Sequence, residues 1–473
     1  MFFNSFTFVA FFFLVYCSYL FLKSHYKAQN LLLLISSYIF YGYWDARFLL
    51  LLAFSTGVDY CVGRWLEQYQ SIRLRRIFLA LSILSNLAVL IFFKYFNFFS
   101  LSIINLLSSI GLNPDPLTLN IILPVGISFY TFQTLSYSID VYKGKISAEK
   151  NLINFALFVS FFPQLVAGPI ERASTLLPQI SKPRFLNVDQ INAGLFLILW
   201  GYFKKLVIAD NLGGIADEIF ESYTTYEGLD LLIGSLAFTV QIYGDFSGYS
   251  DIARGLAKLM GFDFMLNFNL PFFATSPSNF WARWHISLST WFRDYVYIPL
   301  GGNRLGAIAT YRNLTVTMLL CGLWHGAAWN FILWGAFHGM ILIGYRMAKP
   351  YFLQLPKWLI SNAWITSLLG MGMMIFLTTI GWILFRSSNL QQAFYILTNI
   401  NFSSSSETSS LAHDLLFFSL PLLIVQIYQF ISQDLLILTK LSPWLRVFLY
   451  GGILSAIIVF SSRDRSEFIY FQF

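Results

Sequence analysis

Residues 315–335 form an almost uncharged run, Thr315-Val-Thr-Met-Leu-Leu-Cys-Gly-Leu-Trp-His-Gly-Ala-Ala-Trp-Asn-Phe-Ile-Leu-Trp-Gly335. Such an apolar run can cross a bilayer, because a helix needs about 20 residues to do so. His325 lies in its middle, directly before Gly326. An ionisable group inside an apolar span is costly, and it is a functional-site hypothesis by default. We therefore expect a membrane-embedded site at His325, with residues 311–346 forming two spans hinged at His325-Gly326.

The whole chain has the composition of a multi-pass membrane protein. Of its 473 residues, 57% are hydrophobic and 11% are charged, whereas a soluble domain carries roughly 25% charged residues. Phe (51), Tyr (26) and Trp (13) are abundant, as they are in packed membrane helices and in interfacial belts. The predicted fold class is an all-α polytopic membrane protein.

The net charge of +7 does not indicate a nucleic-acid partner. The Lys and Arg residues are spread between apolar spans, where they set topology against the anionic cytoplasmic leaflet. With residues 6–22 as a retained first span and the N-terminus outside, the basic clusters up to residue 150 fall on the cytoplasmic side and the loop 113–116 falls outside. The cysteines have no paired or metal-type spacing.

Apolar runs long enough to span a bilayer recur along the chain. Residues 30–63 are interrupted by Tyr41-Gly-Tyr-Trp-Asp-Ala-Arg47 and predict two short spans, and two prolines and a glycine in 152–170 predict a broken or re-entrant element. We expect about 11–13 transmembrane or re-entrant helices around a central funnel, in a single domain over 1–473. The other expected spans are 6–22, 76–98, 119–138, 191–209, 230–248, 364–385, 411–433 and 444–461.

Residues 262–310 are the least membrane-like part of the chain. Asn, Arg and His side chains alternate there with Trp281, Trp284 and Trp291, and a plain loop would not need so many large aromatic residues. We expect an interfacial or re-entrant element that folds into the bundle and lines a cavity. It lies within the core motif region, 241–340.

His325 and His285 are the candidate reactive groups. At His325, Gly322 and Gly326 allow close helix packing, so the imidazole either bonds a neighbouring helix or accepts a proton as a general base. His285 is either a solvated interfacial side chain or a group that orients substrate for His325. Its flanking polar residues, and the tryptophan before His325, are weaker candidates for shaping the funnel: Arg283, Arg293, Asp294 and Trp324.

Other polar residues have simpler explanations. On an unbroken helix, His338 would point about 220° away from His325, which predicts a structural role. Asp251 and Arg254 are three residues apart and could form a buried pair that holds the bundle together. The spacing of the histidines does not fit a zinc site, and no P-loop or complete Gly-x-Ser-x-Gly motif occurs. A membrane histidine without its own nucleophile suits direct transfer between two bound substrates.

Four motifs stand out in the second half of the chain: Gln241-Ile-Tyr-Gly-Asp-Phe-Ser-Gly-Tyr-Ser-Asp-Ile252, Arg283-Trp-His-Ile-Ser-Leu-Ser-Thr-Trp-Phe-Arg-Asp294, Tyr297-Ile-Pro-Leu-Gly-Gly302 and Leu323-Trp-His-Gly326. They resemble motifs of the membrane-bound O-acyltransferase superfamily, and in particular of its bacterial alginate O-acetyltransferase branch. The resemblance extends to Ser136-Tyr-Ser-Ile-Asp-Val-Tyr142, to Phe161-Phe-Pro-Gln-Leu-Val-Ala-Gly-Pro169 and to Phe468-Ile-Tyr-Phe-Gln-Phe473. One departure is Ala282, where many relatives carry a basic residue.

The resemblance implies an enzyme of the inner (cytoplasmic) membrane that acetylates an exported, alginate-like polysaccharide. It aligns His325 with the family's catalytic histidine and His285 with its second motif histidine. The acyl donor would be a cytoplasmic thioester such as acetyl-CoA, with no cofactor and no metal. A periplasmic SGNH-hydrolase-like acetyl carrier or transferase and the polysaccharide export machinery would be partners. Three alternatives remain open at this point: D-alanyl transfer to teichoic acid, a transporter or flippase, and a structural scaffold for an export complex.

Overall fold

The computed structural model describes residues 1–473 except 113, 116, 117, 120, 166, 167, 353–361, 463–467 and 470–473. The predicted loop 113–116, the Phe161–Pro169 motif and the Phe468–Phe473 motif lie partly outside the described residues. The chain divides into two compact units, each described by itself. Unit 1 comprises residues 1–195 and 253–265, and unit 2 comprises residues 196–252 and 266–473. The single domain stays a prediction.

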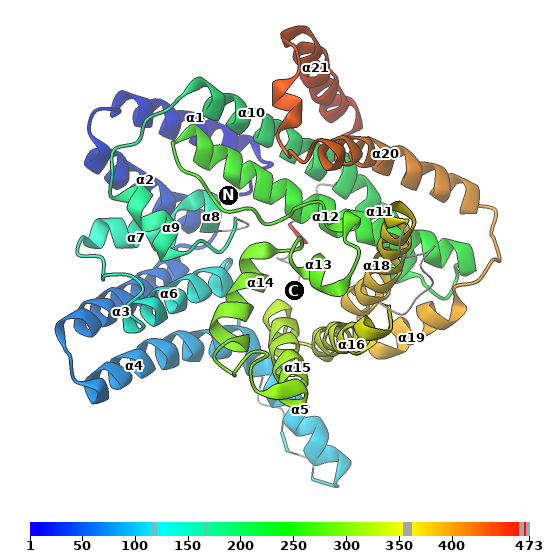
Figure 1. The fold of residues 1–473 in the computed structure, drawn as a ribbon, viewed down its shortest axis with the longest axis horizontal. Coiled ribbons are helices and arrows are strands. Elements are labelled where there is room, and N and C mark those ends of the chain that lie inside the picture. The colour runs from blue at the N-terminus through cyan, green and yellow to red at the C-terminus, as the bar shows by residue number, and fades with distance from the viewer. Residues whose placement is uncertain are drawn as a thin grey trace. The chain divides into compact units, whose positions relative to one another are not determined.

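The described residues are helical and contain no β-strand (Figure 1). Eight helices among them are long and apolar enough to cross a membrane. Two shorter apolar helices cover Phe6–Phe21 and Leu152–Leu165. The prediction of an all-α, multi-pass membrane protein is confirmed. The eight spans are Ala46–Gln68, Ile72–Ser109, Val188–Glu221, Gly228–Leu259, Trp329–Tyr351, Ala363–Arg386, Thr408–Ser432 and Pro443–Phe460.

Unit 1 contains the N-terminal helices. The predicted interruption at 41–47 is confirmed, because α2 ends at Gly42 and α3 begins at Leu49. The predicted break within 152–170 is also present, since α7 ends at Ser160 and the short α8 begins at Phe162. The helices are α1 (Phe6–Phe21), α2 (Tyr26–Gly42), α3 (Leu49–Gln68), α4 (Ile72–Leu90), α5 (Phe96–Ser109), α6 (Ile127–Tyr142), α7 (Leu152–Ser160), α8 (Phe162–Leu165) and α9 (Ala173–Ile180).

A buried polar cluster joins α3, α4 and α6. The carboxylate of Asp59 on α3 accepts hydrogen bonds from Ser138 Oγ at 2.6 Å and from Asn86 Nδ2 at 2.7 Å, and a third from Ser82. Ser55 Oγ donates to Asn86 Oδ1 at 2.7 Å. Hydrogen bonds between polar side chains stabilise helix contacts in an apolar environment, so this cluster fixes the register of three helices.

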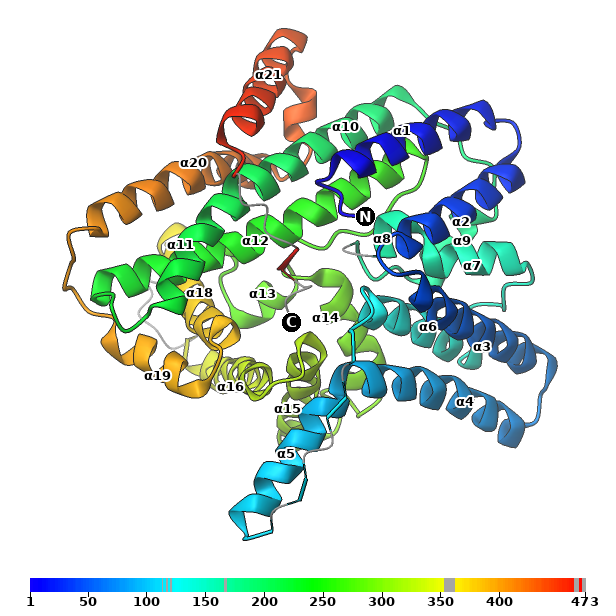
Figure 2. The same ribbon diagram turned by 180° about the vertical axis from the view of Figure 1, so that it is seen from behind.

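Unit 2 carries the motif region. Helices α10 and α12 run from one unit into the other along the chain, and a π-helical segment, Phe203–Ala209, joins α10 to α11. The helices are α10 (Val188–Tyr202), α11 (Asp210–Glu221), α12 (Gly228–Leu259), α13 (Pro277–Trp281), α14 (Ile286–Phe292), α15 (Gly306–His325), α16 (Trp329–Phe352), α18 (Ala363–Arg386), α19 (Leu390–Asn399), α20 (Thr408–Ser432) and α21 (Pro443–Phe460), as both views show (Figure 2).

The predicted break at His325-Gly326 is confirmed, but of the two helices that it separates only α16 is among the eight long apolar helices. Helix α15 ends at His325, Gly326 is extended with φ −160° and ψ 155°, and α16 begins at Trp329. The two helices then pack closely. A Cβ on Gly322 would lie 2.2 Å from the carbonyl oxygen of Phe331, and one on Gly335 would lie 2.3 Å from that of Met318. Only glycine fits at these two positions.

Buried ion pairs join α12 to the π-helical segment. Lys205 Nζ lies 2.7 Å from Asp245 Oδ1 and 2.8 Å from Asp210 Oδ1. Lys204 Nζ lies 2.7 Å from Asp251 Oδ2. Asp251 thus has a partly buried lysine partner that the sequence did not suggest. The expected pair of Asp251 with Arg254 stays a prediction. Buried charges of opposite sign compensate one another where water cannot.

Candidate active site

His285 lies in an irregular turn between two short helices. Helix α13 ends at Trp281 and α14 begins at Ile286, and His285 between them has φ 40° and ψ 56°. This left-handed conformation is unfavourable for a residue with a Cβ atom, and it persists only where the surroundings hold it. The turn is a strained backbone position inside unit 2.

Asn267 holds this turn. Its carbonyl oxygen accepts the N–H of Ile286 at 2.9 Å, and its Oδ1 accepts the N–H of Ser287 at 3.4 Å. Its Nδ2 donates to Ser250 Oγ on α12 at 3.2 Å. Asn267 is fully buried, so each of these bonds forms away from bulk water. The amide side chain links the turn of His285 to α12.

The structure brings His285 and His325 together. The centroids of the two imidazole rings are 6.5 Å apart, with 58° between the ring planes. His285 is 0% exposed and His325 is 3% exposed. The two histidines singled out from the sequence thus share one buried site, which joins the turn before α14 to the end of α15.

Aromatic rings surround the pair. The ring of Phe246 contacts His285 edge-on at 4.6 Å, and the ring of Trp324 lies 5.7 Å from His285. The ring of Trp334 lies 4.9 Å from His325, and that of Phe385 lies 5.4 Å from it. Four elements contribute these rings: α12, α15, α16 and α18. His325 therefore faces protein side chains within unit 2.

His338 lies next to this site. The ring of Trp334 contacts both His338, at 4.6 Å, and His325, at 4.9 Å. The angle expected for an unbroken helix does not apply, because the chain breaks at Gly326. Trp334 thus lies between His338 and His325.

Burial determines the electrostatics of His285. It lowers the pKa of His285 to about 3, because an imidazolium ion would lose its hydration among aromatic rings. At neutral pH the ring of His285 is therefore uncharged. A neutral imidazole can accept a hydrogen bond at one nitrogen and donate one at the other, which suits a group that orients a partner.

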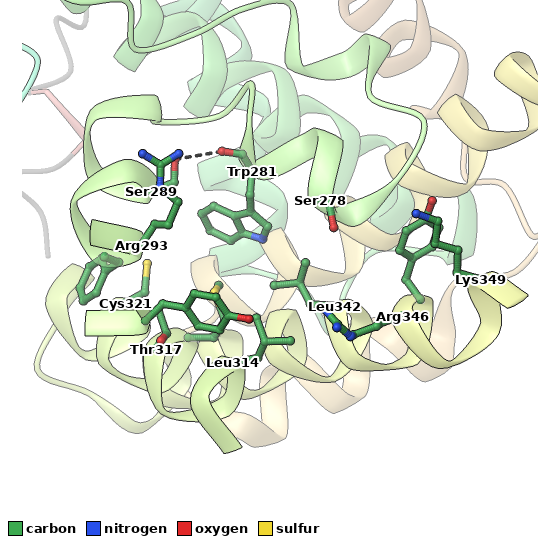
Figure 3. Close-up of a pocket in the computed structure, with 14 residues that line it drawn as sticks. Ser278, Trp281, Ser289, Arg293, Leu314, Thr317, Cys321, Leu342, Arg346 and Lys349 are labelled. Carbon is green, nitrogen blue, oxygen red and sulfur yellow. Dashed lines mark hydrogen bonds between the residues drawn. The ribbon is translucent and has the colours of Figure 1, made fainter. Parts of the chain in front are cut away.

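A cavity of about 360 Å³ lies in unit 2 next to α15 (Figure 3). Its lining includes Cys321, which is one helical turn before His325. The Trp281 ring lies between the Arg293 and Leu342 sides of the cavity in Figure 3, and Ser289 Oγ donates to the carbonyl oxygen of Trp281 at 2.9 Å. The other lining residues are Ser278, Phe292, Tyr297, Leu314, Thr317, Met318, Tyr345, Arg346 and Lys349.

Three cations line this cavity: Arg293, Arg346 and Lys349. Arg293 Nε lies 2.8 Å from Asp294 Oδ1, which compensates part of its charge. Arg346 and Lys349 extend from the last turns of α16. The cavity therefore joins an apolar interior to a basic rim, an arrangement that favours a ligand with an anionic part and an apolar or neutral part.

The weaker candidates from the sequence occupy different places. Arg293 lines the cavity, and Asp294 pairs with it. Trp324 lies against His285. Arg283 has a structural set of bonds, since its Nε donates to Asn279 Oδ1 at 3.1 Å and its Nη1 donates to the carbonyl oxygen of Asn269 at 3.0 Å. The catalytic and binding roles of all these residues stay predictions.

Sequence reasoning missed several residues of the site. Asn267 was one polar residue among many, and nothing in the sequence marked its bonds to the turn of His285. Arg346 and Lys349 follow an apolar span, a position that is usually explained by topology. Trp334 offered one signal, because it lies between His325 and His338 in a short Trp- and Gly-rich segment.

Within the described part of the chain, no group of three or more His, Cys, Asp or Glu residues could hold a metal ion.

Comparisons with known proteins point to one family. The model of the membrane-bound O-acyltransferase family matches residues 78–385. The chain is 47% identical over 373 residues to the "Probable alginate O-acetylase" of Pseudomonas aeruginosa, covering 78% of this chain and 68% of the relative. It is 36% identical over 401 residues to the peptidoglycan O-acetyltransferase of Helicobacter pylori, covering 78% and 73%. It is 29% identical over 260 residues to the teichoic acid D-alanyltransferase of Bacillus subtilis, covering 53% and 65%.

Proposed function

Because the chain belongs to the membrane-bound O-acyltransferase family and is an O-acyltransferase, we propose that it acetylates hydroxyl groups of an exported, alginate-like polysaccharide. The acetyl group comes from a cytoplasmic thioester and passes outward across the inner membrane. The observation that carries this proposal is the buried His285–His325 pair, 6.5 Å between ring centroids, in a chain that is 47% identical to an alginate O-acetylase relative.

The choice of acetyl over D-alanyl rests on the relatives. Identity is 47% to the alginate relative and 36% to the peptidoglycan O-acetyltransferase, but 29%, over a shorter alignment, to the D-alanyltransferase. The first two names share an O-acetyl product on a carbohydrate polymer. The proposal therefore keeps acetyl as the group and a polysaccharide as the acceptor.

In the proposed reaction His325 acts as a general base. The acceptor hydroxyl gives its proton to the imidazole, and its oxygen attacks the carbonyl carbon of the thioester. The C–O bond forms, the C–S bond breaks, and the thiolate takes the proton from the imidazolium. A thioester is already activated, so the main tasks are deprotonation and positioning. A placed base contributes typically about 10²–10⁴-fold to such a step.

His285 supports this step as a neutral group. Its uncharged imidazole can bond the hydroxyl or the thioester carbonyl and hold it beside His325. The strained turn that Asn267 fixes keeps the ring at one place, and preorganised groups need no rearrangement during the reaction. The aromatic surroundings exclude bulk water, which protects the thioester from hydrolysis.

The basic cavity is the proposed donor site. Arg293, Arg346 and Lys349 on its lining suit the phosphate groups of acetyl-CoA, because guanidinium and ammonium groups bind phosphate strongly. A volume of about 360 Å³ falls within the range of ligand pockets, about 300–1,000 Å³. The thioester end would reach the site past Cys321. The donor is a substrate, and the proposal includes no cofactor and no metal.

The proposed partners are supported by the likeness to alginate O-acetylases. The lipid bilayer surrounds the enzyme, and the polymer is made and exported by polysaccharide machinery with which the enzyme works. A periplasmic SGNH-hydrolase-like protein would take the acetyl group on to the sugar as carrier or transferase. A nucleic-acid partner is not part of the proposal.

One experiment tests this function. The chromosomal copy is replaced by His325→Ala in the native host, and the secreted polymer is analysed by mass spectrometry for ester-linked groups. The proposal expects acetyl esters from wild-type cells, their loss from the variant, and the same amount of protein in the membrane. Wild-type acetylation in the variant contradicts the proposal and fits a transporter or flippase, and D-alanyl esters contradict the choice of acetyl.

A further inference from the structure

Phe468 and Ile469 lie in the interior of unit 2. Phe468 is 0% exposed and Ile469 is 3% exposed. In both views the short red segment that contains them lies next to α12 (Figures 1 and 2). In a membrane, contact with lipid tails is as favourable for an apolar side chain as contact with protein. The burial of Phe468 and Ile469 inside the protein therefore depends on specific packing and hydrogen bonds.

The backbone of this segment is anchored to a buried charge. The N–H of Ile469 donates to Asp245 Oδ2 on α12 at 2.7 Å. The other oxygen of Asp245 lies 2.7 Å from Lys205 Nζ, and both side chains are 3% exposed or less. Hydrogen bonds to an ionised group are shorter and stronger than those between neutral groups. The segment is therefore held on α12 by a charge-assisted bond.

The side chain of Phe468 packs against two aromatic rings of α12. Its ring lies 4.6 Å from that of Tyr249 and 5.6 Å from that of Phe246. Phe246 follows Asp245 on α12, and its ring contacts His285 edge-on at 4.6 Å, with 83° between the planes. Phe468 thus backs the ring of Phe246, which contacts His285.

His285 depends on such support. Its backbone is in the left-handed region, where a non-glycine residue stays only if packing and hydrogen bonds hold it. Asn267 holds the backbone of the turn from one direction. Phe246 limits the position of the ring, and Phe468 limits the position of Phe246. Loss of Phe468 would leave a cavity behind Phe246, into which that ring can move.

We infer that Phe468 and Ile469 form a positioning element for His285, docked on Asp245 and acting through Phe246. Neither residue touches the reacting atoms, so both are positioning residues. The inference rests on the proposed role of the His285–His325 site. It adds a part of the chain far from the histidine motifs in sequence to the machinery of acyl transfer.

The test measures transfer kinetics in membranes from the native host, where each variant replaces the chromosomal copy. Radiolabelled acetyl-CoA is the donor, and label on the polymer is followed against donor concentration, per amount of variant protein. Phe468→Ala is expected to lower the maximal rate at least about tenfold, because misplacement by about 1 Å can cost up to 10²-fold. The KM for acetyl-CoA is expected to stay within about twofold of wild type, because the donor site is elsewhere.

A double-mutant cycle separates positioning from general packing. Phe246→Ala and Phe468→Ala should each slow transfer, and the double variant should be no slower than Phe246→Ala alone, because residues that act through one contact are not additive. Phe468→Leu, which keeps an apolar group against Phe246, should restore most of the rate. Phe448→Ala changes an exposed phenylalanine on α21 and serves as the matched control, with wild-type kinetics expected.

Several results would overturn the inference. These are a wild-type rate in Phe468→Ala, a double variant whose loss equals the product of the single losses, or no recovery in Phe468→Leu at equal amounts of folded protein. If Phe468→Ala does not accumulate in the membrane, two other variants replace it in the test. These are Phe468→Leu and Ile469→Pro, and the proline removes the N–H that donates to Asp245. His325→Ala in the same membranes keeps the two claims apart. A wild-type rate there refutes the proposed function, whereas its loss beside an unaffected Phe468→Ala refutes only the positioning element.

Discussion

The imidazole rings of His285 and His325 lie 6.5 Å apart, centroid to centroid, in the interior of unit 2. One comes from a strained turn between two short helices, and the other is the last residue of the 20-residue helix α15. His285 is held in place by the turn, and His325 is carried by α15. In the proposed acyl transfer, His285 orients a substrate while His325 exchanges a proton.

The backbone of His285 gives the first prediction. His285→Gly and His285→Ala remove nearly the same side-chain volume. Glycine adopts the left-handed conformation without strain, whereas the Cβ atom of alanine makes it unfavourable. The glycine variant should be more stable than the alanine variant by about 1 kcal/mol. Thermal unfolding in detergent measures this difference, and an alanine variant at least as stable as the glycine variant would contradict the strain. Both variants should transfer acetyl more slowly than wild type.

Asn267 gives the second prediction. Asn267→Ala removes the acceptor of the Ser287 N–H and the donor to Ser250, at a cost of about 1–3 kcal/mol for the buried groups that lose a partner. The maximal transfer rate should fall about tenfold or more, because the turn of His285 loosens. The exposed Asn269 offers the control: Asn269→Ala should behave as wild type. Equal kinetics for the two alanine variants would exclude a role of Asn267 in holding the turn.

The basic cavity gives the third prediction. Arg346→Gln should raise the KM for acetyl-CoA about tenfold at unchanged maximal rate, because it removes one charge-assisted phosphate contact worth roughly 1.4 kcal/mol. The KM of the wild-type enzyme should rise with salt, since exposed charges are screened. Arg304 is an exposed arginine outside the cavity lining, and Arg304→Gln should leave the KM unchanged. If both variants shift the KM equally, general surface charge explains the effect and the cavity does not bind the donor.

The contact of α15 with α16 gives the fourth prediction. A methyl group at Gly335 would lie 2.3 Å from the carbonyl oxygen of Met318, whereas one at Gly344 on the same helix meets nothing within 4 Å. Gly335→Ala should cost about 1–3 kcal/mol and slow transfer by displacing α15. Gly344→Ala should stabilise the protein by up to about 1 kcal/mol, through helix propensity alone. Unfolding temperatures that shift in the same direction for both variants would contradict the close packing.

Much of the fold could be predicted because hydropathy reports directly on membrane helices. The interruptions at 41–47, at 152–170 and at His325-Gly326 were also visible, since glycine, proline and charged residues interrupt an apolar run. The prediction that His338 points away from His325 does not hold, because it started from a wrong assumption. It assumed one helix, and the break at Gly326 lets both imidazoles contact Trp334.

The site itself was only partly predictable. The motif histidines stood out because ionisable residues are rare in such a chain, but their separation is a tertiary property. The same holds for Asp251, whose partner Lys204 comes from a preceding helix, and for Asn267, whose bonds depend on a turn that no local pattern indicates. Phe468 belongs to a stretch that resembles the family, but its role could not be predicted, because it depends on what the ring packs against.

The most direct measurement of the central claim is acetyl transfer by the reconstituted system. Wild type and His325→Gln are compared in vesicles that contain the export machinery, with radiolabelled acetyl-CoA on the cytoplasmic side and label counted on the polymer. Glutamine keeps a similar size and polarity but cannot take up a proton at neutral pH. If His325 is the general base, the variant should lose at least about 10²-fold in maximal rate, with a KM for acetyl-CoA near that of wild type. Transfer at the wild-type rate by His325→Gln would exclude this role of His325.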